Sequence, residues 1–187
     1  MTESTRRGFM QYSGASVVGA AALSLPTSSR AAGANERVRV ALMGCGGRGP
    51  TVAGIFDENP SAEISHLIDR DAGRLGRVAA KCPTAAPTDD VRRVLDDDSA
   101  DAVIVATPVH WHTPGAILAC EAGKHVYVEK PCSHNVREGR LLIEAAKKHD
   151  CLIQHGTQVR STSTIQEGVR MLHEGLIGDV MVARAWN

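Results

Sequence analysis

Short apolar runs alternate with amphipathic stretches along the chain from residue 37 onward. This alternation is typical of βαβ units that build a parallel sheet. The run at 100–107 is apolar at nearly every position, as expected for a central strand covered on both faces. The pattern therefore predicts an α/β fold, a Rossmann-type doubly wound parallel sheet. Its predicted strands are 37–44, 62–68, 100–107, 125–129 and 151–156.

Helices are predicted between these strands, where apolar residues recur at the helical period. Asp89 or Asp90 is expected to cap one helix, and Thr113 another that has Pro114 in its first turn and Gly123 at its end. The predicted helices cover residues 48–58, 72–81, 89–97, 113–122 and 135–150. The last of these is the most strongly amphipathic, and its inner side is expected to hold Val136, Leu141, Leu142, Ala145 and Ala146.

One more helix, at 162–174, and one more strand, at 178–186, follow the parallel pattern. This last strand carries Val180, Val182 and Trp186, but no neighbouring strand is in sight for it. An unpaired apolar strand is an edge that a domain cannot easily hide.

The composition limits the function classes. The 187 residues are 43% hydrophobic and 22% charged, enough for the core of one domain and the beginning of a second. The formal net charge is zero, so no field favours nucleic acid or an anionic membrane surface. We expect no nucleic-acid partner.

The cysteines do not form a recognisable framework. Cys45, Cys82, Cys120, Cys132 and Cys151 are odd in number and contain no C-x-x-C pair. We interpret them as small buried hydrophobic residues rather than as disulfide partners.

Residues 1–34 have the layout of a cleavable export signal. Arg6 and Arg7 precede a weakly apolar run at 12–26, and small residues follow it. The run is shorter than the roughly 20 apolar residues of a membrane span. The segment is similar to a twin-arginine leader cleaved after Ala31 or Ala34, which predicts a periplasmic or otherwise exported protein with no further membrane contact. The alternative is an initial helix that carries two arginines by chance.

The letters GCGGRG at 44–49 place three glycines, Gly44, Gly46 and Gly49, in G-x-G-x-x-G spacing. This spacing alone is weak evidence, but here it follows a predicted strand, opens a predicted helix and precedes Asp69 at the end of the next strand. Gly44 permits the tight turn, Gly46 lets the backbone approach a pyrophosphate, and Gly49 lets the helix pack on the sheet. We therefore predict a dinucleotide site, which also includes Cys45, Gly47 and Arg48, against the alternative of a purely structural glycine turn.

The choice between NAD and NADP depends on two neighbours. Asp69 can accept hydrogen bonds from both ribose hydroxyls and would repel a 2′-phosphate, which favours NAD. Arg70 follows directly and could pair with that phosphate, so NADP stays possible.

Four stretches, GCGGRG, ATPVHWH, AGKHVYVEKP and EGLIGDVMVARAW, resemble the Gfo/Idh/MocA oxidoreductases over residues 37–187. The resemblance implies a Rossmann domain at 35–156, and at 157–187 the incomplete, truncated start of an α+β mixed-sheet substrate domain. It also implies a hydride transfer between a tightly held nicotinamide cofactor and a sugar or cyclitol hydroxyl, and a homo-oligomer for the complete protein.

The E-K-P motif of that family corresponds to Glu129, Lys130 and Pro131. The resemblance implies that Glu129 and Lys130 lie at the cofactor, that Lys130 contacts the reacting hydroxyl, and that the Lys130–Pro131 bond is cis. The position of Lys130 at the carboxyl end of a predicted strand supports this, because ligands gather at the carboxyl ends of parallel strands. An ammonium there can stabilise a developing oxyanion or pass a proton onward. The alternative is a surface lysine after a strand.

Two further stretches carry expected contacts. By the resemblance, Thr107 and Pro108 lie against the ribose or pyrophosphate and His112 lies at the mouth of the next helix. Gln158 and Arg160 would face substrate or nicotinamide, although a solvated arginine is an equal alternative. His110 and His112 could instead bind a metal, but no third ligand stands at useful spacing, so no metal is predicted.

One feature of the family has no counterpart here. Its second domain carries an aspartate and a histidine one helical turn apart, and no histidine of this chain follows His173. We therefore expect a fragment of a longer protein or a truncated product. The main hypothesis is an NAD(P)-dependent oxidoreductase acting on a small sugar or cyclitol. The alternatives are an NAD-dependent glycosidase of the same fold and a dinucleotide-binding module without catalysis.

Overall fold

The computed structural model describes residues 37–186, so the predicted export signal at 1–34 lies outside the described residues. Six strands form one sheet: β1 Val38–Met43, β2 Ala62–Ile68, β3 Ala86–Thr88, β4 Ala102–Val105, β5 His125–Glu129 and β6 Ile153–Gly156. The helices are α2 Gly49–Asp57, α3 Ala72–Ala79, α4 Val91–Leu95, α5 His112–Glu121, α6 Val136–Lys148 and α7 Ser163–His173. Two short 3-10 turns, η1 Val109–Trp111 and η2 Gln158–Ser161, complete the elements.

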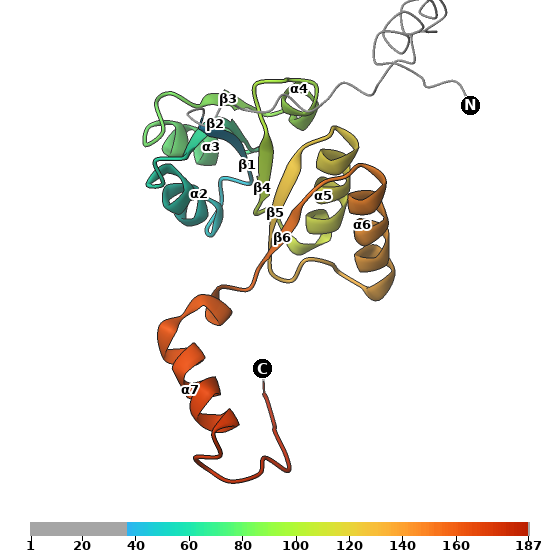
Figure 1. Cartoon of the computed structure of the whole chain (residues 1–187). Helices are drawn as coiled ribbons and strands as arrows, with labels where there is room; N and C mark the ends of the chain where they lie inside the picture. The colour runs from blue at the N-terminus through green and yellow to red at the C-terminus, as the bar shows by residue number, and fades with distance from the viewer. Residues whose placement is uncertain (1–36, 187) are drawn as a thin grey trace, which may run out of the picture. The chain divides into compact units, whose positions relative to one another are not determined.

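The sheet is parallel throughout, in the order β3-β2-β1-β4-β5-β6 (Figure 1). Strand order reverses between β1 and β4, the place where a doubly wound sheet opens a crevice at its carboxyl edge. The predicted Rossmann-type fold is therefore confirmed. β3 is a strand that the apolar pattern does not mark, and its Pro87 is tolerated because the strand lies at the edge.

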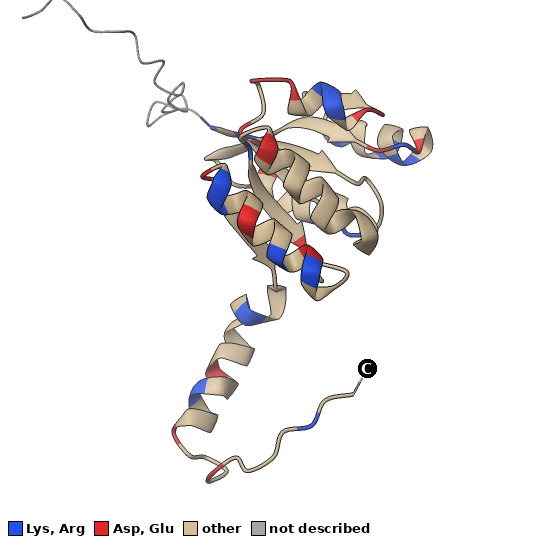
Figure 2. Cartoon of the chain, turned by 90° about the vertical axis from the view of Figure 1, so that its right-hand side faces the viewer, with Lys and Arg blue, Asp and Glu red and all other residues tan. Residues whose placement is uncertain are grey.

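Helices cover both faces of the sheet, and each face has its own apolar cluster. On the face of α2 and α3 the cluster includes Val40, Leu42, Val52, Ile64, Val78 and Ile104. On the face of α5 and α6 it includes Ala41, Met43, Val103, Val105, Ala116 and Leu142. Charged residues lie mainly on helices and loops, whereas the sheet is almost uncharged (Figure 2). This distribution explains why the strands appear in the sequence as apolar runs.

Helix α6 is less buried than its pattern predicts. Leu142 is buried and Ala145 packs against the same cluster, but Val136 and Leu141 are exposed, which corrects their assignment to the inner side. The helix packs beside α5 at the end of the sheet (Figure 1), so only one line of its side chains meets the core.

Two local predictions are wrong. Helix α5 begins at His112, so Thr113 is not its cap, and the Thr113 hydroxyl donates instead to the carbonyl of Cys132. Residues 179–186 form no strand, and Val180, Val182 and Trp186 are exposed. Within residues 37–186 they pair with no strand of the sheet, so their backbone joins no hydrogen-bonded ladder.

The interpretation of the cysteines as buried residues is confirmed for three of them. All five thiols are free; Cys45, Cys120 and Cys151 are buried, whereas Cys82 and Cys132 are half-buried. Among residues 37–186, no helix combines the length and apolar content that a bilayer span requires.

Candidate functional site

In the turn between β1 and α2, two positions must be glycine because a side chain there would collide with the protein's own backbone. Gly44 has a φ of +103°, and a Cβ there would lie 2.6 Å from the carbonyl oxygen of Ala106. A Cβ on Gly49 would lie 1.9 Å from the carbonyl oxygen of Gly44 and 3.3 Å from the Leu42 side chain. The obstacle at Gly49 is therefore first the turn itself and only then the helix–sheet contact predicted from the sequence.

The other two glycines face open space. A Cβ on Gly47 would meet no atom within 4 Å, and one on Gly46 would meet only Arg74 Nη1, at 3.7 Å. No side chain caps α2, whose N-cap residue is Arg48, and no acidic residue lies in its first turn. The free N–H groups of this helix end therefore remain available to an anion beside an unobstructed backbone. A diphosphate fits these donors.

Asp69 connects the end of β2 to the glycine turn. Its Oδ2 accepts a hydrogen bond from the Cys45 amide at 2.8 Å, and its Oδ1 accepts one from the Asp71 amide at 2.8 Å. A carboxylate has further lone pairs that can accept from ribose hydroxyls. Arg70 is exposed, and its guanidinium has no partner within residues 37–186.

Cys45 contributes packing rather than reactivity. Its side chain is buried in the apolar cluster of α2 and α3. Burial raises the pKa of the Cys45 thiol to about 11, so the thiol stays protonated at neutral pH. Its amide faces Asp69, so its contribution to a cofactor site is the shape of the turn.

Sequence reasoning missed the basic side of this site. A pocket beside the turn is lined by Gly46, Gly47 and three basic residues: Arg74 and Arg77 in α3, and Lys81 just after its end. Arg74 and Arg77 are three residues apart and so lie on one helical face, which is the signal that the sequence offers. A basic wall beside an open glycine turn suits a phosphate-bearing ligand.

The loop after β4 holds an unpaired polar group. Thr107 Oγ1 is buried and has no hydrogen-bond partner within residues 37–186. Buried hydroxyls are nearly always paired, so a ligand group at this position would satisfy an otherwise costly atom. Pro108 is exposed and leads into η1. The placement of both residues at the carboxyl end of β4 fits a dinucleotide.

His112 lies at the start of helix α5, the position predicted for it, and its side chain is buried. It is 3% exposed, with Nδ1 2.6 Å from the carbonyl oxygen of Pro131 and Nε2 2.8 Å from that of Thr107. The ring therefore lies between two loops of the chain, and its contact with a cofactor stays a prediction. No group of three or more metal-ligating side chains gathers among residues 37–186, and both ring nitrogens of His112 face carbonyl oxygens.

Glu129 is the centre of the polar contacts at the end of β5. It is 3% exposed, and its carboxylate accepts from Arg48 Nε at 3.0 Å, Gln158 Nε2 at 2.7 Å and the Lys130 amide at 3.1 Å. The Tyr127 hydroxyl lies 3.4 Å away. Burial acts to raise the pKa of Glu129, but the hydrogen bonds from Arg48 and Gln158 outweigh it and the pKa lies below its ordinary value.

Arg48 and Gln158, which the sequence predicts as ligand contacts, have Glu129 as their hydrogen-bond partner. Both were assigned to ligands, yet each donates to Glu129, so the glycine turn and η2 are tied to the same carboxylate. Arg160, also in η2, is exposed, and its guanidinium has no partner within residues 37–186. The ligand roles of the three residues stay predictions.

Lys130 is held by its backbone and free at its tip. Its amide donates to Glu129, its bond to Pro131 is cis, and its exposed ammonium has no partner among residues 37–186. The ammonium therefore stands at the carboxyl edge of the sheet, the same edge as the glycine turn and Thr107.

Comparison with known proteins identifies the family of the chain. Residues 38–157 match the model of an oxidoreductase family with an NAD-binding Rossmann fold, Gfo/Idh/MocA. The chain belongs to the Gfo/Idh/MocA family. The resemblance seen in the sequence is thus confirmed over the whole of the parallel sheet.

Three relatives illustrate the range of the Gfo/Idh/MocA proteins. A glycosyl hydrolase family 109 protein of Saccharopolyspora erythraea is 34% identical over 79% of this chain and 34% of its own length. The scyllo-inositol 2-dehydrogenase (NAD(+)) of Bacillus subtilis is 31% identical over 76% and 42%. A solved 3-ketoreductase of Actinomadura kijaniata, in complex with NADP and TDP-benzene, superposes with a TM-score of 0.72 at 25% identity over 77% and 44%.

The chain therefore spans less than half the length of these Gfo/Idh/MocA relatives. The matched part is the sheet with its glycine turn and its E-K-P loop.

Proposed function

We propose that this chain provides the dinucleotide-binding part of an NAD(P)-dependent oxidoreductase that transfers a hydride between a nicotinamide cofactor and a sugar or cyclitol hydroxyl. The observation that carries the proposal is the uncapped N-terminus of α2 beside the open Gly46 and Gly47, at the same sheet edge as the unpaired Thr107 hydroxyl and the Lys130 ammonium. The B. subtilis relative is a cyclitol dehydrogenase and the A. kijaniata relative a ketoreductase, and both names support this reaction class.

Each residue has a stated task in this reaction. The first-turn amides of α2 bind the diphosphate, and Asp69 accepts from the ribose hydroxyls. Bound nicotinamide supplies an acceptor or donor for one hydride. Oxidation of a carbinol would transfer that hydride from carbon to the nicotinamide and release the hydroxyl proton from oxygen to solvent water. Lys130 stabilises the charge that develops on this oxygen, while Glu129 holds the lysine's backbone in place.

Titration of the chain with dinucleotides tests the cofactor assignment. We expect NADH to bind tighter than NADPH, because the Asp69 carboxylate repels a 2′-phosphate. Asp69→Asn should weaken NADH binding roughly tenfold and shift the preference toward NADPH. Asp71→Asn, which changes an exposed carboxylate two residues away, should leave the ratio unchanged. NADPH binding tenfold tighter than NADH in the unaltered chain would show that Asp69 has another role.

The hydride transfer itself is tested by absorbance of the reduced cofactor. Free sugars, inositols and 3-keto sugars should give net oxidation or reduction of added cofactor. Lys130→Met should abolish this turnover while dinucleotide binding persists. Turnover that survives Lys130→Met would remove the lysine from the chemistry.

A second candidate function is an NAD-dependent glycosidase, favoured by the 34% identity to the family 109 glycosyl hydrolase. Such an enzyme oxidises a sugar hydroxyl, eliminates the aglycone and reduces the sugar again, so cofactor is neither consumed nor produced. Release of nitrophenol from a nitrophenyl glycoside without net change in cofactor absorbance would favour it over the dehydrogenase. Binding of dinucleotide with neither reaction would leave the non-catalytic module.

We also propose that the protein is exported by the twin-arginine route, on the basis of Arg6, Arg7 and the apolar run that follows them. This route carries folded proteins, so the cofactor can be loaded in the cytoplasm. Replacing both arginines by lysine should retain the protein inside the cell, as measured by fractionation. Unchanged export of that variant would contradict the proposal.

A further inference from the structure

His112 lies between the two loops that leave the central strands β4 and β5. Its Nε2 is 2.8 Å from the carbonyl oxygen of Thr107, and its Nδ1 is 2.6 Å from that of Pro131. The first loop carries the unpaired Thr107 hydroxyl, and the second begins at Lys130. Because the side chain is 3% exposed, water cannot readily replace either contact.

Both ring nitrogens of His112 face backbone carbonyl oxygens. Carbonyl oxygens only accept, so each ring nitrogen must carry a hydrogen to make its bond. A neutral imidazole has a single N–H and can bind one loop at a time, whereas a ring protonated on both nitrogens binds both loops together. The next residue strengthens one side, because the Thr113 hydroxyl donates to the Cys132 carbonyl at 3.0 Å.

We propose that His112 is a positioning residue that bridges these loops with a hydrogen on each ring nitrogen and so sets Lys130 at a fixed place relative to Thr107. Its effect on the loops is a property of the chain, and only its effect on hydride transfer rests on the function proposed above. The residue acts through the backbone of Thr107 and Pro131 and touches neither substrate nor cofactor.

Two conservative variants separate the halves of the bridge. In His112→Asn the amide nitrogen stands where Nδ1 stands, so the contact with Pro131 can persist while that with Thr107 is lost. In His112→Gln the amide nitrogen reaches the position of Nε2, so the contact with Thr107 can persist while that with Pro131 is lost. His112→Leu removes both. His110→Asn is the matched control, since His110 is exposed and makes no hydrogen bond within residues 37–186.

Nuclear magnetic resonance of the 187-residue chain tests the bridge directly. In the unaltered protein, both ring ¹⁵N signals of His112 should have the shift of a nitrogen that carries hydrogen. Amide shifts should concentrate around Thr107 in the Asn variant and around Lys130 to Cys132 in the Gln variant. A ring with only one protonated nitrogen, or the same amides shifted in both variants, would overturn the proposal.

Binding and turnover provide the functional readout. We expect His112→Asn to raise the Kd for NADH roughly tenfold with a smaller change in kcat, and His112→Gln to lower kcat roughly tenfold with Kd nearly unchanged. Equal losses of both quantities in both variants would indicate a merely structural histidine and overturn the proposal. If the unaltered chain bound no dinucleotide, the proposed function would fail, while the resonance pattern would still decide the role of His112.

Discussion

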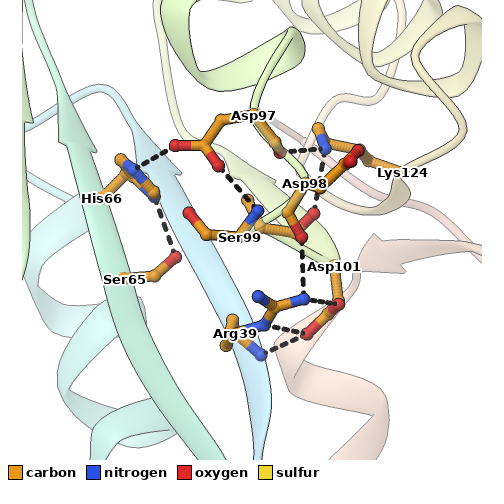
Figure 3. A network of polar contacts seen from close by, with 9 residues as sticks. Arg39, Ser65, His66, Asp97, Asp98, Ser99, Asp101 and Lys124 are labelled. Carbon is orange, nitrogen blue, oxygen red and sulfur yellow. Dashed lines mark hydrogen bonds and ion pairs between the residues drawn. The ribbon is translucent and has the colours of Figure 1, made fainter. Parts of the chain in front are cut away.

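The two edges of the parallel sheet differ in how their polar groups are satisfied. At the amino edge, Asp101 accepts from the amide of Arg39 at 2.8 Å and from its guanidinium at 2.7 Å and 3.0 Å (Figure 3). The Lys124 ammonium, in a residue 5% exposed, donates to the carbonyls of Asp97 and Ala100 at 2.7 Å and 2.9 Å. The charged groups of Asp101 and Lys124 in Figure 3 thus have their hydrogen-bond partners within the chain.

At the carboxyl edge, several polar groups lack a partner in the described part of the chain. They include the Thr107 hydroxyl, the Lys130 ammonium and the first amides of α2. Both edges belong to the same strands, so the difference does not come from the fold as such. The amino edge therefore contributes stability, whereas the carboxyl edge holds the groups on which the proposed cofactor site depends.

The largest effect is expected at the glycine turn. Gly49→Ala would place a Cβ 1.9 Å from the Gly44 carbonyl oxygen, so the turn must move. We expect the free energy of unfolding to fall by about 3 kcal/mol and dinucleotide binding to be lost. Urea unfolding and NADH titration measure the two effects. Gly47→Ala, which meets no atom within 4 Å, should unfold like the unaltered chain, and equal stability of both variants would show that the turn can yield.

Loss of the hydrogen bonds of Glu129 should have the next largest effect on the free energy of unfolding. In Glu129→Gln a donor faces the donors Arg48 and Gln158, which we expect to cost about 2 kcal/mol in urea unfolding. The pKa of Glu129 is lowered in the fold, so its contribution is present above the ordinary value of 4.5 and is lost as the pH falls below it. The acid side of the stability profile should therefore be shallower in the variant. Glu121→Gln, at an exposed position, should keep the original slope.

The buried lysine of the amino edge sharpens the comparison. Lys124→Met leaves the carbonyls of Asp97 and Ala100 without their donor, which we expect to cost about 1.5 kcal/mol in urea unfolding. NADH affinity should not change, since the residue lies at the opposite edge. A weakened NADH affinity would mean that the two edges are coupled.

The smallest effect is expected for Asp101→Asn. The pair with Arg39 is partly exposed, so its loss should cost less than about 1 kcal/mol. Burial opposes ionisation of Asp101, but the bonds from Arg39 prevail and its pKa lies below 3.8. The stabilisation is therefore present above that value and disappears as the pH falls below it. Thermal melts at pH 7 and pH 3 measure this, and a larger loss at pH 3 would contradict it.

The elements were predictable where one local signal dominated. Strand β4 stands out because every residue in it is apolar, and helix α5 because Pro114 lies in its first turn and Gly123 follows its end. Strand β3 did not, because three residues with a central proline carry no period and depend on pairing with β2. Residues 179–186 failed for the opposite reason, since they have a strand-like pattern but no neighbour within the described chain.

Some residues of the candidate site could likewise be predicted from the sequence, and others could not. The glycine turn and Asp69 were found because the motif lies within one βαβ unit and its chemistry follows from residue type and spacing. The partners of Glu129 could not be found, because Arg48 and Gln158 are distant from it in the sequence and their side chains could equally have faced a ligand. The two carbonyl contacts of the His112 ring could not be predicted for the same reason.

The sequence by itself determined the parallel α/β fold, the glycine turn and the placement of Lys130 at a strand end, because each depends on the order of residues over short distances. Only the tertiary structure decided which polar groups pair with one another. Hydrogen bonds such as those of Glu129, His112 and Lys124 join residues brought together by the sheet, and their energies depend on burial and distance that no linear pattern contains.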